Sequence, residues 1–404
     1  PSSVVEVATA VPAFIGYTEK ADNKGKSLLN KPWRIASMAE YHSYFGYAPV
    51  PKFQIVEKAA DSTEEAAFSQ GGKDYVLTQE SGKYFLYYSM LLFYQNSGGP
   101  CYVVSVGDYG KDIEPDKLSD GIELLLKEQE PTMVVIPDAM LLKAQADAIT
   151  VQQAALVHCG ERMKNRVAIL DVYDGHKDRK DPAGDVIENF RGALGINNLD
   201  FAAAYYPWLN TTIVQDKDLS YENFSNMDVL QTILKTELGI QDTPPVIDPK
   251  DPPVVKAQKG KLIKQTEIIA SMTSDWKDVG AGDLPIHKSL LNKSLAAMSP
   301  LFNTVLLDLK RKLNLLPPSA AIAGIYTMVD NSKGVWRAPA NVSMNSVISP
   351  AVTISRDEQE DLNVTTQGKS INAIRTFIGE GTLVWGARTL DGNSLDWRYI
   401  NVRR

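Results

Sequence analysis

The residues best suited to chemistry lie in one loop, at positions 171–181. This loop contains four aspartates, one histidine and three Lys/Arg residues, and it continues an apolar run. Enzymes with parallel α/β sheets place their sites at the carboxyl ends of such strands, so a soluble α/β enzyme that uses this acidic loop is one hypothesis. The loop lacks the Asp-x-Asp-x-Asp-Gly order of a calcium site. Because its charges nearly balance, a solvated loop is the favoured interpretation.

Nucleotide binding and nucleophilic catalysis lack their motifs. Gly25-Lys26-Ser27 matches the end of a phosphate-binding loop, but the motif also needs a glycine where Lys20 stands. No serine or cysteine occupies the turn that presents a nucleophile in Gly-x-Ser-x-Gly enzymes. We therefore expect no enzyme activity, no catalytic residue and no cofactor.

The histidines and cysteines are too dispersed to predict a metal site. None of them shows the spacing of metal ligands. The two cysteines, Cys101 and Cys159, are expected to be buried apolar thiols rather than a disulfide. A catalytic triad or a metal site is equally not expected from the histidines, which are His42, His158, His176 and His287.

The composition is that of a soluble globular protein with room for two or three domains. Of its 404 residues 44% are apolar and 23% are charged. The net charge of −7 argues against a nucleic-acid partner, which would require clustered Lys and Arg. No apolar run is long enough for membrane insertion, and residues 1–6 do not resemble a signal peptide.

Apolar runs alternate with amphipathic segments through the first half of the chain. This alternation predicts an α/β fold, a mostly parallel sheet with helices on both faces. A capping box, Ser37 with Glu40, predicts a helix start, and residues 51–80 are expected to form a loop or small hairpin. Strands are expected at residues 11–17, 101–106, 132–136, 167–172 and 201–206, and helices at 81–96, 118–127, 144–164 and 186–191.

Three regions follow from these patterns. Residues 1–210 form the predicted α/β body, to which residues 285–330 return with a buried strand at 320–326. Residues 211–284, with one clear helix at 227–238, are expected to be a variable, solvent-facing insertion. Residues 331–404 are expected to form a small C-terminal α+β module, with a helix capped by Ser355 and Glu358 and with strands at 371–377, 382–389 and 396–402.

The C-terminal region is rich in Trp and Arg and contains little that is catalytic. Such residues either form the core and rim of a small module or make a contact surface, since Trp and Arg dominate interface energetics. Residues 331–404 contain nine Lys/Arg and seven Asp/Glu and so carry a net +2, which leaves −9 on the preceding residues. We predict a contact surface made of Gly334, Val335, Trp336, Arg337, Ala338, Pro339, Asn341, Arg375, Trp385, Arg388, Trp397, Arg398, Tyr399 and Arg403.

Seven segments, in the same order, resemble the contractile tail sheath proteins of bacteriophages and of extracellular contractile injection systems. The strongest matches are the last three segments. Members of this family usually continue beyond both ends of this chain, with an arm before the first strand and a helix and arm after the last. The segments are residues 11–18, 190–195 with 202–208, 317–319 with 324–326, 334–341, 371–377, 384–389 and 397–404.

The resemblance implies a structural subunit that polymerises as a helical lattice around an inner tube. It implies six-fold rings of identical subunits, an exchange of terminal strands between neighbours, and contraction from a metastable extended state that drives the tube through a target envelope. The implied partners are other copies of the chain, the inner tube protein, and baseplate and terminator proteins at the ends. Assembly in the bacterial cytoplasm and action in a virion tail or a released extracellular particle are also implied. We expect the C-terminal module to face the tube.

Overall fold

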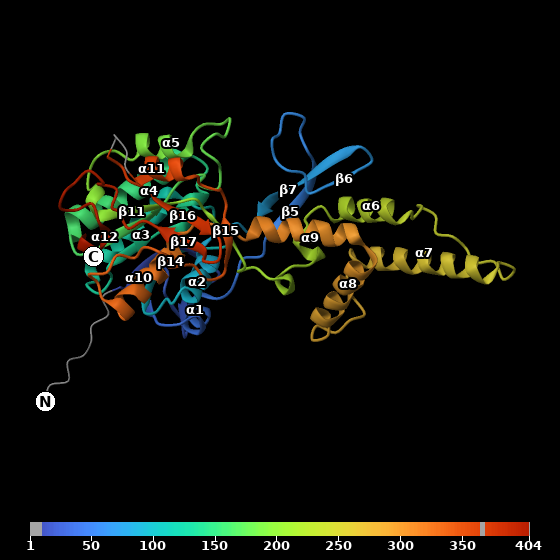
Figure 1. Cartoon of the computed structure of the whole chain (residues 1–404). Helices are drawn as coiled ribbons and strands as arrows, with labels where there is room; N and C mark the ends of the chain where they lie inside the picture. Colours follow the sequence, from blue (N-terminus) through green and yellow to red (C-terminus); the bar gives the residue numbers. More distant parts are fainter. Residues whose placement is uncertain (1–9, 364–367, 404) are drawn as a thin grey trace. The chain divides into compact units, whose positions relative to one another are not determined.

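The structure, a computed structural model, describes residues 10–363 and 368–403 (Figure 1). The chain divides into two compact units. Unit 1 comprises Pro1–Pro49, Tyr84–Ile213 and Asn314–Arg404. Unit 2 comprises Val50–Lys83 and Val214–Leu313, so it is inserted into unit 1 at two places.

A nine-stranded sheet forms the centre of unit 1, and its middle is parallel as predicted. The chain's second parallel strand, β8, lies on one side of β1, and the next three follow on the other side, so the order is that of a doubly wound sheet. These strands are buried almost throughout, which explains their nearly continuous apolar sequences. They are β1 (Pro12–Thr18), β8 (Cys101–Asp108), β9 (Met133–Val135), β10 (Val167–Asp171) and β11 (Ala202–Tyr206).

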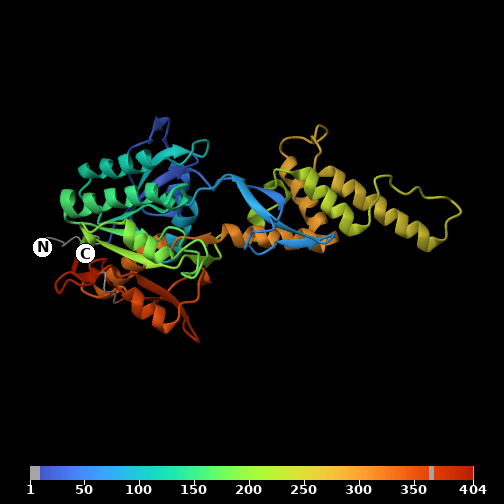
Figure 2. The ribbon, with the colours of Figure 1, turned by 90° about the horizontal axis from the view of Figure 1, so that it is seen from above.

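Helices cover both faces of this sheet, as the sequence predicts (Figure 2). One layer consists of α3 (Pro115–Glu123), α4 (Gln145–Val157) and α5 (Val186–Ala193). The other consists of α2 (Leu86–Gln95) and α10 (Ser319–Lys333), which pack on each other. The apolar strands are therefore shielded from water on both sides.

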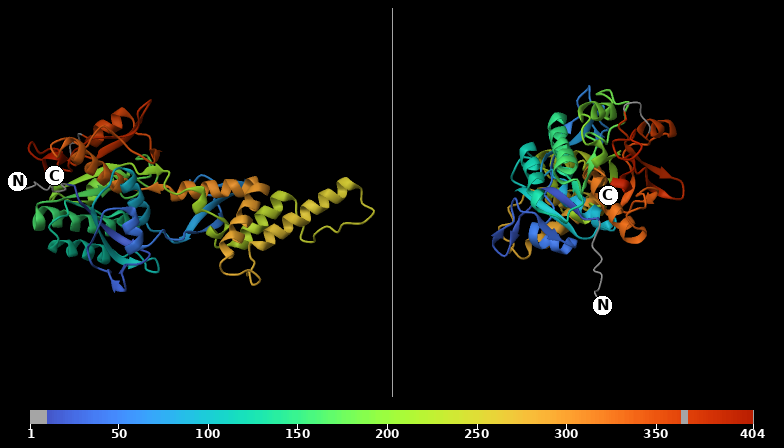
Figure 3. Two further views of the ribbon diagram at one scale, coloured as in Figure 1. Left: turned by 90° about the horizontal axis from the view of Figure 1, so that it is seen from below. Right: turned by 90° about the vertical axis from the view of Figure 1, so that its left-hand side faces the viewer.

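The C-terminal region extends the same sheet instead of forming a module of its own, which corrects the predicted boundary at residue 331 (Figure 3). Strand β16 (Asn372–Phe377) pairs in parallel with β11, and β17 (Gly381–Trp385) pairs antiparallel with β16. Strand β14 (Val342–Ser343) follows at the edge. The C-terminal strands join the central sheet because the sequence at the start of β16 is apolar, and Ala373 and Ile374 are completely buried there.

Two other predictions about unit 1 are wrong. Residues 320–326, expected as a strand, lie inside helix α10, because a short apolar run does not distinguish a buried strand from a buried helix. The strand expected at 396–402 is absent; an isolated bridge joins Arg388 to Tyr399, and helix α12 (Ile400–Arg403) follows. The capped helices are confirmed as α1 (Met38–Phe45) and α11 (Arg356–Asn363).

The remaining strands of unit 1 are short. Strand β4 (Trp33–Ile35) is the edge opposite β14 and pairs antiparallel with β8. A second small sheet joins β12 (Leu209–Thr211) to β13 (Leu315–Leu316) and β15 (Val347–Pro350), and a two-stranded ribbon joins β2 (Asp22–Asn23) to β3 (Lys26–Ser27).

Unit 2 combines a three-stranded sheet with four α-helices. Residues 51–80, expected as a loop or hairpin, form β5 (Lys52–Glu57), β6 (Phe68–Gln70) and β7 (Lys73–Ser81). The helix at 227–238 is confirmed as α6 (Met227–Leu238). The lysine-rich segment after it forms a second helix, α7 (Pro253–Ser271), and residues 285–313 belong here instead of returning to the body. They form α8 (Leu284–Met298) and α9 (Pro300–Leu313), which are separated at Ser299, directly before Pro300.

Among the described residues, no helix is long and apolar enough to span a bilayer.

Gly324 sets the distance between α10 and α2. A Cβ atom at this position would lie 2.5 Å from the carbonyl oxygen of Asn96 and 2.7 Å from that of Phe93, so the two helices touch through backbone. Gly324→Ala should therefore lower the free energy of unfolding by about 1–3 kcal/mol, measured as the urea midpoint followed by circular dichroism. The matched control is Gly192→Ala in α5, where a Cβ meets nothing within 4 Å. Equal midpoints for the two variants would contradict this packing.

Candidate assembly surface

The predicted Trp and Arg residues form two groups on the C-terminal part of unit 1. The first begins with a turn in which the amide of Arg337 donates to the carbonyl of Gly334 at 3.1 Å. Trp336 lies in this turn with 76% of its surface exposed. The carbonyl oxygen of Trp336 accepts a hydrogen bond of 2.9 Å from the side chain of Asn401, so helix α12 holds the turn in place.

Tyr399 is the centre of the first group. The guanidinium carbon of Arg388 lies 5.6 Å from the centroid of the Tyr399 ring, and that of Arg398 lies 5.4 Å from it. Such distances are typical of cation–π contacts. Within residues 10–363 and 368–403 neither guanidinium forms an ion pair, and the buried Nε of Arg398 has no hydrogen-bond partner. Two positive charges therefore converge on one half-exposed aromatic ring, and no carboxylate of the described part of the chain pairs with them.

Asn372, on which sequence reasoning placed no weight, positions Arg388. Its side chain is fully buried, donates to the Arg388 carbonyl at 2.8 Å and accepts from the Arg388 amide at 2.8 Å. It also donates to the carbonyl of Ala204 at 3.1 Å. Through these bonds the loop after β17 is fixed to the central sheet. The signal that marked this position was a polar residue within the apolar start of the expected strand, between Ile371 and Ala373.

The second group lies on one face of β16 and β17. The side chains of Arg375 and Phe377 share a face with Trp385, which is half-exposed. The Phe377 and Trp385 rings are 4.9 Å apart, and the Arg375 guanidinium carbon is 5.1 Å from the Phe377 centroid. Arg375 also donates to the side chain of Gln359. The set is a small aromatic surface with a cation at its edge.

The other predicted residues lie along the segments that join these groups. Asn341 is exposed and its amide donates to Val384 at 2.7 Å, which sets β14 against β17. Val335 and Ala338 are half-buried, Pro339 is buried, and Trp397 is half-exposed next to Arg398. Arg403 is the last residue of α12, and its side chain lies outside the described part. The structure thus unites residues from three distant segments.

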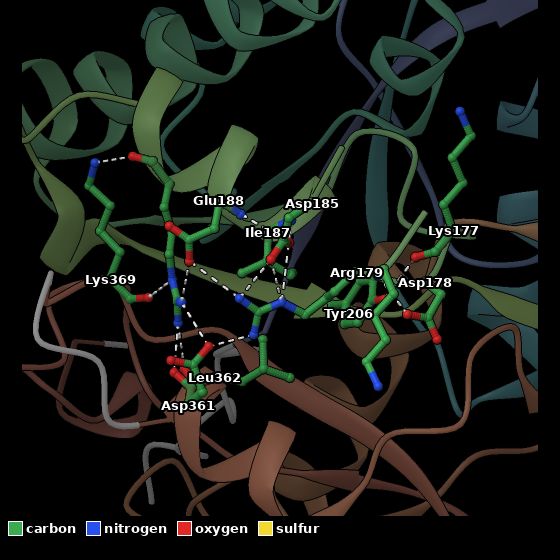
Figure 4. A network of polar contacts seen from close by, with 12 residues as sticks. Lys177, Asp178, Arg179, Asp185, Ile187, Glu188, Tyr206, Asp361, Leu362 and Lys369 are labelled. Atoms are coloured by element: carbon green, nitrogen blue, oxygen red, sulfur yellow. Dashed lines mark hydrogen bonds and ion pairs between the residues drawn. The ribbon is translucent and has the colours of Figure 1, made fainter. Parts of the chain in front are cut away.

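A network of charged side chains fastens the C-terminal region to helix α5 (Figure 4). Arg179 donates to Asp185 at 3.0 Å, to Glu188 at 3.3 Å and, at short range, to Asp361 of α11. The hydrogen bond from Arg179 holds the pKa of Asp361 below its usual value. An acidic residue of the C-terminal region is thereby held by a cation of the body.

Arg191 is the buried member of this network, with 1% of its surface exposed. Its guanidinium pairs with Asp361 at 3.4 Å and donates to the carbonyl oxygens of Asp361 at 2.9 Å and Lys369 at 3.0 Å. Its acidic partners are half-exposed, namely Asp361 and Glu188, the latter at 3.5 Å, so the guanidinium carries the cost of burial, which these ion pairs and the carbonyl oxygens offset. The network stabilises the junction between α5 and the residues that lead into β16.

The acidic loop at 171–181 does not form an open cluster of carboxylates. Asp171 is buried and accepts hydrogen bonds from Ser319, from its amide at 2.9 Å and its hydroxyl at 2.6 Å. Asp174 pairs with Lys177 at 3.3 Å, while Asp178 and Asp181 accept from backbone amides two residues ahead in the loop. Each carboxylate is therefore occupied by the protein's own groups, which weakens the enzyme hypothesis.

The histidines and cysteines lie in separate surroundings. His42 contacts Tyr87 at 3.0 Å, and His158 contacts Arg166 at 3.2 Å, while the His176 ring lies 5.0 Å from that of Trp208. Both cysteines are free and buried, as predicted, and burial raises the pKa of each thiol to about 12. No group of three potential metal ligands occurs among the described residues.

Comparison with known proteins gives matches at the level of structure only. No family model and no curated protein matches the sequence. A chain in the cryo-EM structure of the anti-feeding prophage helical sheath in its contracted state matches with a TM-score of 0.50 and 21% identity, over 100% of this chain and 68% of that one. A chain in the contracted baseplate of the same particle matches with a TM-score of 0.55 and 19% identity, over 100% and 70%. The expected sheath-protein fold is thereby confirmed.

Asp171 gives unit 1 a predictable pH dependence. Burial raises its pKa to about 7 in the folded protein, against about 3.9 in an unfolded chain. The folded state therefore binds the proton more tightly, and the stability that this group contributes is greatest below pH 4 and is lost as the pH rises to 7. The asparagine in Asp171→Asn does not titrate. The free energy of unfolding of this variant, taken relative to that of the wild type, should therefore be higher at pH 7.5 than at pH 4.5 by at least about 1 kcal/mol. Urea unfolding at both pH values measures this, and an equal effect at both would contradict it.

Proposed function

Because the chain has the fold of proteins in contractile sheath assemblies, we propose that it is a structural subunit of a contractile sheath. The observation that supports this proposal most directly is the match to a helical-sheath chain along the whole of this sequence. In the proposed role, identical subunits stack in six-fold rings around an inner tube, with baseplate and terminator proteins at the ends. The subunit is assembled in the bacterial cytoplasm and acts in a virion tail or a released particle, and it has no catalytic role.

The two groups of Trp and Arg residues support a role in assembly. Within the described residues Arg388 and Arg398 have no carboxylate partner, and both lie next to the Tyr399 ring, just before helix α12, whose Asn401 binds the turn of the exposed Trp336. Exposed aromatic side chains beside Arg are what protein interfaces prefer. An acidic face of the inner tube, or of a neighbouring copy, would neutralise the two guanidinium groups. We therefore assign this surface to the tube side of the subunit.

The sheet edge supports strand exchange between neighbours. Beyond the five-residue strand β17 the sheet ends with β14, which contributes only two residues. A short edge strand leaves backbone donors and acceptors for a strand from another subunit, and strand addition of this kind gives strength through main-chain hydrogen bonds. Contacts that do not close into a ring generate a helical filament. Contraction is then a rigid-body rearrangement from a metastable extended lattice to a more stable one.

The proposal predicts that the protein polymerises. Negative-stain electron microscopy of the expressed protein should show long hollow tubes with regular striations. A uniform population of monomers at every concentration would contradict self-assembly.

The role of the first group can be tested separately by substitution. The double variant Arg388→Ala with Arg398→Ala should lower the sedimentable, tubular fraction at least about tenfold, because every subunit of the polymer would lack the contacts of both guanidinium groups. The matched control is Arg356→Ala on α11, whose side chain is 87% exposed and paired only with Glu360. This control should assemble like the wild type, and circular dichroism should report the same fold for all. Assembly of the double variant at wild-type level would exclude the assigned surface.

A further inference from the structure

The chain passes from unit 1 to unit 2 and back twice, and each return leads into a helix of one layer. The first return occurs at Tyr84, and helix α2 begins at Leu86. The second occurs at Asn314, and helix α10 begins at Ser319. The chain therefore re-enters unit 1 close to the start of each of these two helices.

Neither helix is capped by its own N-cap residue. Phe85 and Pro318 occupy the N-cap positions, and neither side chain can accept a hydrogen bond from the first amides. The amides are bound instead by carboxylates from distant parts of the chain. Asp138 accepts from Phe85 at 2.7 Å and from Leu86 at 3.2 Å, while Asp171 accepts from Ser319 at 2.9 Å.

Both carboxylates belong to the carboxyl edge of the central sheet. Asp171 is the last residue of β10, and Asp138 follows the neighbouring strand β9. Asp138 also accepts from the Tyr17 amide of β1 at 2.8 Å, and a Cβ atom at Gly16 would lie 2.5 Å from its carboxylate. The sheet thus admits Asp138 only because Gly16 lacks a side chain. At each return point, hydrogen bonds therefore join the start of the helix to a carboxylate at the end of a strand.

These contacts are unusual in being buried and without a cation. Asp138 is completely buried and Asp171 is 2% exposed, and neither forms an ion pair within the described ranges. Burying a carboxylate without a cation is unfavourable, and the positive end of a helix together with several N–H donors offsets part of this cost. A serine or aspartate at the N-cap would cap either helix locally. A remote carboxylate does more, because it joins the helix start to the sheet.

The two tied helices also contact each other. Gly324 of α10 lies against the backbone at the end of α2, so a shift of one helix must displace the other. Strands β12 and β13 pair beside the second return. The amide of Thr211 donates to the carbonyl of Asn314 there, at 2.9 Å. Loosening one return should therefore loosen both.

We propose that Asp138 and Asp171 are a coupled pair of anchors that fasten the two chain segments returning from unit 2 to the central sheet of unit 1. A displacement of unit 2 is then transmitted to the sheet instead of unravelling α2 or α10. This inference concerns the chain itself and goes beyond the proposed sheath function, so it holds whether or not the protein polymerises.

Hydrogen–deuterium exchange of the whole protein, below its assembly concentration, tests the coupling. Asp171→Ala should speed amide exchange at residues 319–324 at least tenfold, and it should also speed exchange in α2. Asp138→Ala should act first on residues 85–90 and also speed exchange in α10. Faster exchange only in the helix whose carboxylate was removed would contradict the coupling between the two helices. Exchange at the wild-type rate in both helices would contradict the anchoring role of the carboxylates.

The matched control removes an ordinary cap that is not at a return. Ser37 accepts from the Glu40 amide at 3.2 Å, and Ser37→Ala should speed exchange only at the start of α1. If an alanine variant fails to fold, Asp138→Asn, Asp171→Asn and Ser319→Ala keep the test available, because each removes only part of an anchor and should give the same pattern with smaller effects.

Trypsin gives an independent measurement at the first return. Lys83 is exposed and directly precedes the anchored turn, so cleavage after it requires local opening of residues 84–88. Asp138→Ala should raise this cleavage rate at least tenfold, while Ser37→Ala should leave it unchanged. Equal rates for the two variants would overturn the anchor at Asp138.

Discussion

The parallel pairing of β11 with β16 is the contact on which the C-terminal half of unit 1 depends. Only two residue pairs make it, Tyr205 with Asn372 and Tyr206 with Ala373. The Asn372 side chain adds a hydrogen bond to the carbonyl of Ala204 in β11, and the ion pairs of Arg179 and Arg191 hold the preceding helix α11 against α5. Residues that would otherwise lie on long loops are thereby set on a frame continuous with the central sheet. Sites built on strands keep their geometry better than sites on loops, which suits a surface that meets a partner.

The carboxyl edge of the parallel strands is occupied by the protein's own groups. In doubly wound sheets this edge usually opens into a ligand site at the switch point. Here the edge is occupied by Asp138 and Asp171, which accept hydrogen bonds from the starts of α2 and α10. The groups that would face a substrate in an enzyme are used to stabilise the protein itself. Of these two carboxylates, Asp171 belongs to the loop of the enzyme hypothesis, and the amide and hydroxyl of Ser319 occupy it.

Much of the fold was predictable because local patterns agreed with the final packing. The alternation of buried strands and helices, the cap at Ser37 and the break at Pro300 all follow from neighbouring residues. The run at 320–326 was misassigned because its burial on all sides removes the period that separates strand from helix. Helix α7 was missed because most of its lysine-rich sequence is only half-buried or exposed, so no apolar stripe marks it. The convergence of Arg388 and Arg398 on Tyr399 depends on a long-range pairing that no local pattern encodes.

The double insertion also fixes the order in which the molecule can be completed during synthesis. Strand β11 is made well before β16, and at roughly 5–20 residues per second the ribosome needs on the order of ten seconds to supply the missing strand. Throughout this interval the outer edge of β11 has no partner in the nascent chain, and unit 2 is completed within the same interval, because Val214–Leu313 is made between the two strands. Pairings between such distant residues are slow to form. The residues from 334 to 403, which carry Trp336 and Tyr399, are therefore made only after both segments of unit 2, and their strands pair with the edge that β11 leaves open.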